Sequence, residues 1–324
     1  MKLRRIKAGN DLHVELQAPQ GWVAVAKCLA QLEQRAPERA RALATDIVEL
    51  LGAPAELRAA ILESAKKIDP RAGAAGSIVI PFEPRSFRDF MLYESHAIAA
   101  ARGFVRTQMP AAFQVVRAYE ALTGRTFARL KPHALWYRQP VYYMGNHLTF
   151  ATDGEAVAIP SYARTLDYEL ELGFVLAHPL RDAAPETAEA AIGGFVVLND
   201  FSARDEQLSE MASGFGPQKS KHFRSAISNV VVTADEILPR WRKLKGFVRL
   251  NGALIAEPST AGGRWSLGEV LAHASQAEQL HAGELFGSGT LPGGSGIETG
   301  HALEPGNRIE IGIDGVGTLA NPIV

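Results

Sequence analysis

Apolar residues recur at helical intervals through the first part of the chain. Three Ala-rich stretches show this spacing: VAVAKCLAQLEQ at 23–34, RALATDIVELLG at 41–52 and AELRAAILESAKK at 55–67. Asp69, Pro70 and the small-residue run AGAAG at 72–76 then predict a linker. We therefore expect a small, partly helical N-terminal domain over residues 1–76.

The pattern changes after this linker. SIVIPF at 77–82 predicts a short strand, while FRDFMLYESHAIAAARG at 87–103 and MPAAFQVVRAYEALTG at 109–124 predict helices. From Trp136 onward strand-like runs dominate, and hairpin-type turns are predicted at Asp153-Gly154, Asn251-Gly252 and Asp314-Gly315. Close turns imply antiparallel pairing, so we expect an α+β fold in which residues 77–324 form a second, larger domain with a mixed β-roll or sandwich.

Composition narrows the possible functions. The chain has 324 residues and 47% hydrophobic residues, enough for a large core and against disorder. Thirty-four basic and 35 acidic residues give a net charge of -1, which argues against bulk binding to nucleic acid or an anionic membrane. Cys28 is the only cysteine, so no intrachain disulfide forms. Without a leader-like apolar region or a bilayer-length apolar run, a cytoplasmic protein is expected.

A set of carboxylates suggests a metal site. Glu169 and Glu171, in LDYELELGFVL, are two residues apart, so on a strand they share one face and repel each other unless a cation lies between them. Asp200 and Asp89 could add further oxygen ligands, a donor set that suits Mg²⁺, Mn²⁺ or Ca²⁺ and not zinc. Two alternatives stay open: the glutamates form the solvated face of a half-buried strand, and Asp200 caps a helix.

Other chemically useful residues occur in nearby motifs. Asp89 and His96 lie two turns apart on the helix predicted from FRDFMLYESHA, although a buried, hydrogen-bonded histidine is an equally good interpretation. Arg204 and Gln207 follow Asp200 on one helix face. The Gly-rich stretch GSGTLPGGSGIETG, which can approach a ligand closely, supplies Thr290 and Glu298.

These motifs resemble the fumarylacetoacetate hydrolase family. The resemblance covers about residues 77 to 324 and includes DYELELGFV, LNDFSARDEQ, KHFRS, GSGT with a later Glu, and the closing LEPGNRIEIGIDGVGTLANPIV. It implies a β-roll catalytic domain, a divalent metal (Mg²⁺ or Mn²⁺, with Ca²⁺ also suitable) and a homodimer. The N-terminal part is less typical of the family and more helical.

The resemblance also implies roles for individual residues. Asp89, Glu169, Glu171 and Asp200 match the metal ligands, His96 the general base, and Glu298 the carboxylate that orients this base. Arg204, Gln207 and Lys221 match groups that hold the substrate and polarise its oxygens, with Lys219 as a competitor for the lysine role. Tyr143 and Thr290 match substrate contacts, Met91 stands where the prototype has a tyrosine that touches the substrate, and Ser225 stands where a threonine near the metal is common.

The expected activity is metal-dependent hydrolysis of a carbon–carbon bond in a β-diketo acid of the fumarylacetoacetate or acylpyruvate type. His96 and Glu298 would activate water, and the metal would stabilise the enolate leaving group. Decarboxylation of an oxaloacetate-type acid or keto–enol isomerisation of a dienoic acid is the alternative, and a non-catalytic binding protein is a third possibility. The expected partner is a small keto acid, with neither nucleic acid nor membrane.

Overall fold

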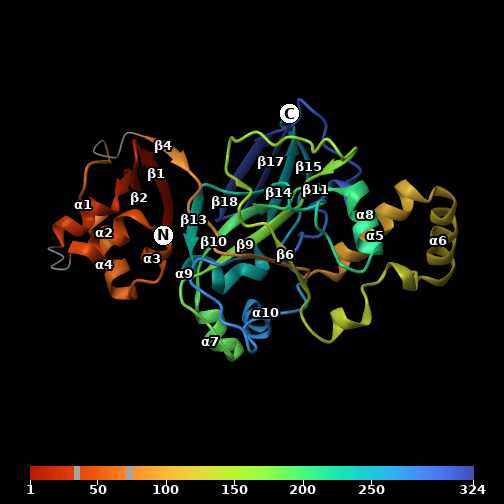
Figure 1. Cartoon of the computed structure of the whole chain (residues 1–324), viewed down its shortest axis with the longest axis horizontal. Coiled ribbons are helices and arrows are strands. Elements are labelled where there is room, and N and C mark those ends of the chain that lie inside the picture. The colour runs from red at the N-terminus through yellow and green to blue at the C-terminus, as the bar shows by residue number, and fades with distance from the viewer. Residues whose placement is uncertain (33–36, 71–75) are drawn as a thin grey trace.

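The computed structural model describes residues 1–32, 37–70 and 76–324 and has an α+β architecture, which confirms the predicted fold class. In Figure 1 the N-terminal strands and helices lie at one end of the long axis and helix α6 at the other, with the sheets between them. Most of the predicted linker (71–75), and the end of the first predicted helix (33–34), lie outside the described residues.

Within the described residues the strands form three sheets, which together position the functional site. The largest is a mixed sheet of twelve strands, whose main path runs β3-β2-β1-β13-β10-β9-β16-β5-β6. Its members are β1 (Lys2–Ala8), β2 (Asp11–Ala18), β3 (Gly21–Ala24), β4 (Ser77–Val79), β5 (Phe87–Phe90), β6 (Tyr142–Gly145), β7 (Phe150–Ala151), β9 (Leu170–Leu176), β10 (Ile192–Asn199), β12 (Ser225–Ile227), β13 (Val230–Thr233) and β16 (Leu285–Gly287). A four-stranded antiparallel sheet contains β14 (Gly246–Leu250), β15 (Ala253–Ala256), β17 (Arg308–Ile313) and β18 (Gly317–Pro322). The third sheet pairs β8 (Leu166–Asp167) with β11 (Ser202–Ala203).

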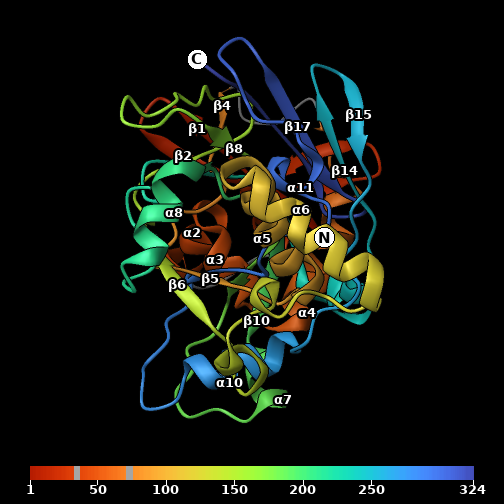
Figure 2. The ribbon, with the colours of Figure 1, turned by 90° about the vertical axis from the view of Figure 1, so that its right-hand side faces the viewer.

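Helices cover the sheets and both ends of the molecule. The α-helices are α1 (Val25–Gln31), α2 (Pro37–Thr45), α3 (Ile47–Leu51), α4 (Ala55–Ala65), α5 (Glu94–Gln108), α6 (Pro110–Thr123), α7 (Pro185–Ala190), α8 (Arg204–Ala212), α9 (Ala234–Ile237), α10 (Leu267–Ala274) and α11 (Gly296–Thr299). Short 3₁₀ helices are η2 (Ala128–Leu130), η3 (Ala134–Tyr137) and η4 (Leu238–Lys243). Figure 2, turned so that this end faces the viewer, shows α5 and α6 in front of the sheets. No helix among the described residues is both long and apolar enough to cross a lipid bilayer.

The central strands β9 and β10 are buried on both faces. Leu172 and Phe174 point into one hydrophobic core, which also contains Ile311 of the four-stranded sheet. Val175 and Val196 belong to a second core, shared with the N-terminal helices. A strand buried on both faces needs an almost continuous apolar run. The few charged residues in these strands are therefore conspicuous.

The N-terminal part contains strands as well as the predicted helices. Strand β1 pairs antiparallel with β13 and so extends the main sheet. No strand is predicted over residues 2–24 from the sequence, because arginines interrupt the apolar alternation of β1. Both arginines form ion pairs, Arg4 with Glu15 and Arg5 with Glu83, which removes the cost of placing them on a sheet. The predicted helix at 41–52 is divided at Asp46, whose side chain accepts a hydrogen bond from the backbone N–H of Val48 at 2.7 Å.

Two sequence predictions for residues 77–324 are wrong in detail. The helix expected from residue 87 begins only at Glu94, because Phe87–Phe90 form the buried strand β5, which pairs in parallel with β16. Asp89 is therefore a strand residue, and His96 lies on the helix that follows. The turn at Asp153 closes no hairpin: its carboxylate accepts the backbone N–H of Ala320, and the preceding β7 runs parallel to β12. The hairpins at Asn251-Gly252 and Asp314-Gly315 are confirmed.

Candidate active site and metal centre

Three buried carboxylates converge from neighbouring strands of the main sheet. Asp89 lies in β5, Glu171 in β9 and Asp200 directly after β10, and their ligand oxygens all lie within 4.8 Å of one another. Strand β16 runs between β5 and β9 and has a glycine at this level. A Cβ atom on Gly287 would lie 2.3 Å from Asp89 Oδ1 and 2.6 Å from Glu171 Oε2. Glycine is therefore what leaves room for the carboxylates.

The cluster fits a divalent cation. As ionised carboxylates, Asp89 Oδ1 and both side-chain oxygens of Glu171 are buried and receive no hydrogen bond from a described donor. Burial, followed by repulsion from Asp200, raises the pKa of Asp89 well above its usual value. Burial, followed by repulsion from Asp89, has the same effect on the pKa of Glu171. Orphaned carboxylate oxygens that repel one another are a donor set for a hard cation such as Mg²⁺, Mn²⁺ or Ca²⁺.

Glu169, the fourth carboxylate predicted as a ligand, lies beside this cluster between two positively charged side chains, Arg204 and Lys221. Its Oε1 accepts a hydrogen bond from Arg204 at 2.6 Å, and its Oε2 accepts one from Lys221 Nζ at 2.5 Å. Burial alone would raise the pKa of Glu169, but Arg204 and Lys221 outweigh it and hold this pKa below its usual value. The role of Glu169 as a ligand stays a prediction.

His96 and Glu298 form a buried pair at the same site. His96 Nδ1 lies 2.9 Å from Glu298 Oε2, and the histidine is only 7% exposed. Glu298 also accepts the hydroxyl of Ser295 at 2.8 Å and the backbone N–H of Gly293 at 3.1 Å, which fix its orientation. Because an ionised carboxylate only accepts hydrogen bonds, Nδ1 is the donor, and Nε2 retains its lone pair for a proton.

A large cavity joins the carboxylates to the histidine. It has a volume of about 690 Å³, and its lining includes Asp89, His96, Glu169, Glu171 and Lys221. The predicted substrate-contacting residues Met91, Gln207, Tyr143 and Thr290 also line it. Tyr143 donates its hydroxyl to Asp200 Oδ2 at 2.7 Å, so it also supports the carboxylate cluster. Burial, followed by repulsion from Asp200, raises the pKa of Tyr143 and keeps this hydroxyl protonated.

The structure separates the two candidate lysines and places Ser225. Lys221 is 4% exposed, and its ammonium contacts both Glu169 and Asp200 at 2.5 Å. Lys219 instead lies over the ring of Tyr162, 5.3 Å from its centroid. Ser225 donates its hydroxyl to Asp200 Oδ1 at 3.2 Å, next to the cluster.

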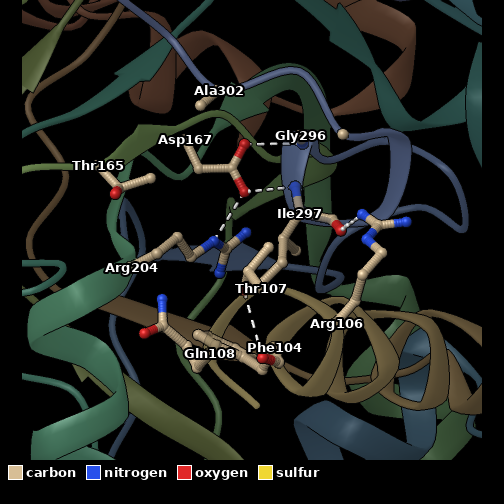
Figure 3. A pocket seen from close by; sticks show the side chains of 11 residues that line it. Phe104, Arg106, Thr107, Gln108, Thr165, Asp167, Arg204, Gly296, Ile297 and Ala302 are labelled. Carbon is tan, nitrogen blue, oxygen red and sulfur yellow. Dashed lines mark hydrogen bonds and ion pairs between the residues drawn. The ribbon is translucent and has the colours of Figure 1, made fainter. Parts of the chain in front are cut away.

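Arg204 lies behind the site and does not line the large cavity. Its two terminal nitrogens contact Glu169 and Gln207. Its Nε contacts Asp167, and the side chain borders a smaller cavity of about 160 Å³ (Figure 3). The direct substrate contact that the family resemblance implies for Arg204 stays a prediction, and in the structure its guanidinium donates to Glu169 and Gln207.

Asp167 is a site residue that was not predicted from the sequence. It is 1% exposed, and its carboxylate accepts the backbone N–H groups of Gly296 and Ile297 at 2.7 and 2.9 Å, as well as Arg204 Nε at 2.7 Å (Figure 3). Because Gly296 and Ile297 directly precede Glu298, Asp167 holds the turn that presents this residue. A signal was present: Asp167 lies two residues before Glu169, at the spacing that singled out Glu169 and Glu171.

Comparisons with known proteins show what this chain's sequence and fold are similar to. The mitochondrial oxaloacetate tautomerase FAHD1 of Pongo abelii is 28% identical over 178 residues, covering 55% of this chain and 78% of that protein. The fold matches solved fumarylacetoacetate hydrolase from Exiguobacterium antarcticum with a TM-score of 0.69 at 19% identity, covering 100% of this chain and 99% of that one. It also matches fumarylpyruvate hydrolase from Pseudomonas aeruginosa, solved with Mn²⁺ and pyruvate, with a TM-score of 0.57 at 20% identity, covering 78% and 93%.

A family model supplies the assignment. The model described as fumarylacetoacetate (FAA) hydrolase C-terminal matches residues 111–324, which contain Glu169, Glu171, Asp200, Lys221 and Glu298. This match shows that the chain, with its carboxylate cluster, its histidine–glutamate pair and its matching fold, belongs to the fumarylacetoacetate hydrolase family.

Proposed function

We propose that the protein hydrolyses a carbon–carbon bond in a β-diketo acid of the acylpyruvate type and depends on a divalent metal. The observation that carries this proposal is the His96–Glu298 pair, 2.9 Å apart, at the cavity that also contains the carboxylate cluster. A metal site alone could support several enolate reactions. A histidine with a fixed tautomer next to that site is what water activation requires.

Asp89, Glu171 and Asp200, with Glu169 as the proposed fourth ligand, would hold the cation. Mg²⁺ or Mn²⁺ is proposed, and the fumarylpyruvate hydrolase of Pseudomonas aeruginosa, solved with Mn²⁺ and pyruvate, supports this choice. When bound, the cation would supply a Lewis acid for the two adjacent oxygens of the keto-acid end. Asp89 and Glu171 would then exchange mutual repulsion for attraction to the cation.

The chain's own residues would perform the proton transfers. His96 Nε2 would accept a proton from water as the water attacks the distal carbonyl carbon, and Glu298 would stabilise the imidazolium that forms at Nδ1. Burial opposes the charge of Lys221, but Asp200 and Glu169 raise its pKa, so the ammonium stays charged. Together with Gln207, the Lys221 ammonium would stabilise the negative charge that develops on the carbonyl oxygen. As this oxyanion re-forms a carbonyl group, the C–C bond would break, the acyl part would leave as a carboxylic acid, and the bond's electron pair would pass to the keto-acid part as an enolate. The proton held on His96 would then return to the enolate carbon.

Keto–enol tautomerisation of an oxaloacetate-type acid is the second candidate, with decarboxylation of such an acid on the same metal site as a variant. It is supported by the relative named oxaloacetate tautomerase. In tautomerisation His96 would move a proton between carbon and solvent, and no water would attack. In decarboxylation the rate would depend more on the metal, as the acceptor of electron density, than on His96 as a base.

A substrate panel separates these reactions. Acetylpyruvate, fumarylpyruvate, fumarylacetoacetate and oxaloacetate would be incubated with the Mn²⁺-loaded protein, and carboxylic acid, CO₂ and the enol absorbance would be followed separately. Release of a carboxylic acid together with pyruvate, or with acetoacetate when the substrate is fumarylacetoacetate, supports the hydrolase. Loss of the enol form of oxaloacetate without cleavage of any diketo acid replaces the hydrolase with the tautomerase. A homodimer remains part of the proposal, and a molar-mass measurement by light scattering tests it.

A further inference from the structure

The large cavity changes character between its buried and exposed ends. The buried end contains the carboxylates and Lys221, which are at most 5% exposed. The other end is lined by Met144, Met211 and Phe215, which are 48%, 56% and 85% exposed. Val141 and Met91 add further apolar surface to the lining. A substrate whose keto-acid end reaches the carboxylate cluster therefore extends its other end along apolar side chains.

The described lining of this cavity offers no spare cation for a second carboxylate. Lys221 is the only lysine or arginine among the residues that line it, and its ammonium already contacts Glu169 and Asp200. At the rim, Gln218 is neutral, and Nε2 of the His222 ring lies 2.9 Å from the backbone oxygen of Met144. A carboxylate brought to this end would gain no counter-charge, whereas a hydrocarbon tail would bury apolar surface against these side chains.

Helix α8 and the loop after it build the apolar end. Met211 lies one turn beyond Gln207 on the same helix face. Phe215 follows between two glycines, Gly214 and Gly216, with φ angles of 83° and 79°. Other residues rarely adopt this left-handed conformation, so the two glycines allow the loop to hold a large exposed aromatic ring at the cavity mouth.

We infer that the substrate's distal group is an uncharged, apolar acyl chain and not a second carboxylate. This inference rests on the proposed function for the identity of the keto-acid end. It narrows the substrate to 2,4-diketo acids with a hydrocarbon tail, and it excludes diacids such as fumarylpyruvate as preferred substrates.

Binding of two matched keto acids tests the inference without requiring turnover. 2-Oxooctanoate and 2-oxosuberate have the same chain length and differ at the far end, methyl in one and carboxylate in the other. Titration calorimetry on the Mn²⁺-loaded protein at about pH 8, where histidine is mostly neutral, should show 2-oxooctanoate binding roughly tenfold more tightly or better. Equal or tighter binding of 2-oxosuberate overturns the inference.

Variants at the apolar end provide the matched comparison. Met211→Arg should shift the preference toward 2-oxosuberate by about tenfold or more, because it supplies the missing cation. Phe215→Ala should weaken 2-oxooctanoate roughly threefold to tenfold, and more than it weakens pyruvate. Leu122→Arg, at an 87% exposed position on α6, should leave the preference unchanged. If Met211→Arg and Leu122→Arg give the same preference as the wild type, Met211 does not border the bound tail and the inference fails.

Adding hexanoylpyruvate to the hydrolysis panel keeps this inference distinguishable from the proposed function. Faster cleavage of fumarylpyruvate than of hexanoylpyruvate contradicts the apolar tail while supporting the hydrolase. Tight binding of 2-oxooctanoate by a protein that cleaves no diketo acid contradicts the hydrolase while supporting the apolar tail.

Discussion

Asp167 Oδ2 lies 2.7 Å from Arg204 Nε, and the same carboxylate receives the backbone N–H groups of Gly296 and Ile297. The buried carboxylate of Asp167 thereby connects the part of the site around Glu169 with the part around Glu298. On one side Arg204 holds Glu169, and on the other the turn presents Glu298 to His96. Asp167 therefore positions these groups while lying outside the large cavity itself.

Replacing Asp167 with Asn should destabilise the protein and slow turnover. Arg204 would remain buried with only Glu169 as a charged partner, and the amide could not accept every backbone N–H. Loss of one partner of a buried pair typically costs about 3–5 kcal/mol. Urea unfolding measures the stability, and kcat should fall by a larger factor than KM rises because the altered part is the catalytic pair. Glu155→Gln is the control, since the ion pair that it forms with Arg224 joins side chains that are 50% and 32% exposed, and about 1 kcal/mol or less is expected.

Gly287→Ala should strongly weaken metal binding. The added Cβ would lie 2.3 Å from Asp89 Oδ1, so the carboxylates must move apart. Calorimetric titration with Mn²⁺ should show an affinity loss of about a hundredfold or more, the upper range for disturbing a metal site's surroundings. Gly263→Ala is the matched control, because its Cβ would have only ordinary contacts, at 3.6 Å or more. Undiminished Mn²⁺ affinity in Gly287→Ala would place the metal elsewhere.

His96→Ala should reduce hydrolysis by roughly 10²–10⁴-fold, the usual scale for loss of a general base. Glu298→Gln should also slow it, since the imidazolium loses its neighbouring charge. The double variant should be little worse than His96→Ala because the two residues act as a unit. Metal affinity should barely change, and the exposed His178→Ala should behave as the wild type. If His96→Ala retains turnover while Glu171→Ala is inactive, water activation is not the role of this site.

Metal should stabilise the protein more strongly as pH rises. Burial, followed by mutual repulsion within the cluster, raises the pKa values of Asp89 and Glu171. A carboxyl group with a raised pKa in the folded state stabilises the fold below its unfolded pKa, and this contribution is lost as pH rises through the folded pKa. The metal-free protein should therefore lose stability toward high pH, and Mg²⁺ or Mn²⁺, replacing the proton, should restore it.

Thermal unfolding with EDTA and with added metal, between about pH 5 and pH 8, measures this effect. The metal-induced rise in Tm should be largest at the upper end of that range. EDTA should also abolish turnover, and added Mg²⁺ or Mn²⁺ should restore it. A metal-induced shift that is the same at both pH values would mean that Asp89 and Glu171 are not protonated in the metal-free protein.

The sequence by itself determined the elements whose signal is local. Asn251-Gly252 and Asp314-Gly315 specify hairpins because those residues tolerate the backbone angles of tight turns, and both hairpins form. The helix α6 was predictable from its apolar spacing and from Gly124, which ends it with a φ of 64°. The acidic residues in the otherwise apolar β9 region were equally visible, because charge in a buried strand requires a partner.

The tertiary structure decided what depends on distant segments. Phe87–Phe90 had helical spacing but became strand β5, since pairing with β16 and β6 buries all four residues. Residues 2–24 became strands because Arg4 and Arg5 find acidic partners only in the folded chain. Only the fold shows that Asp89, Glu171 and Asp200 converge while Glu169 turns to Lys221 and Arg204. These contacts join residues that are far apart in the sequence, and a local sequence pattern does not show which distant residues come close in the fold.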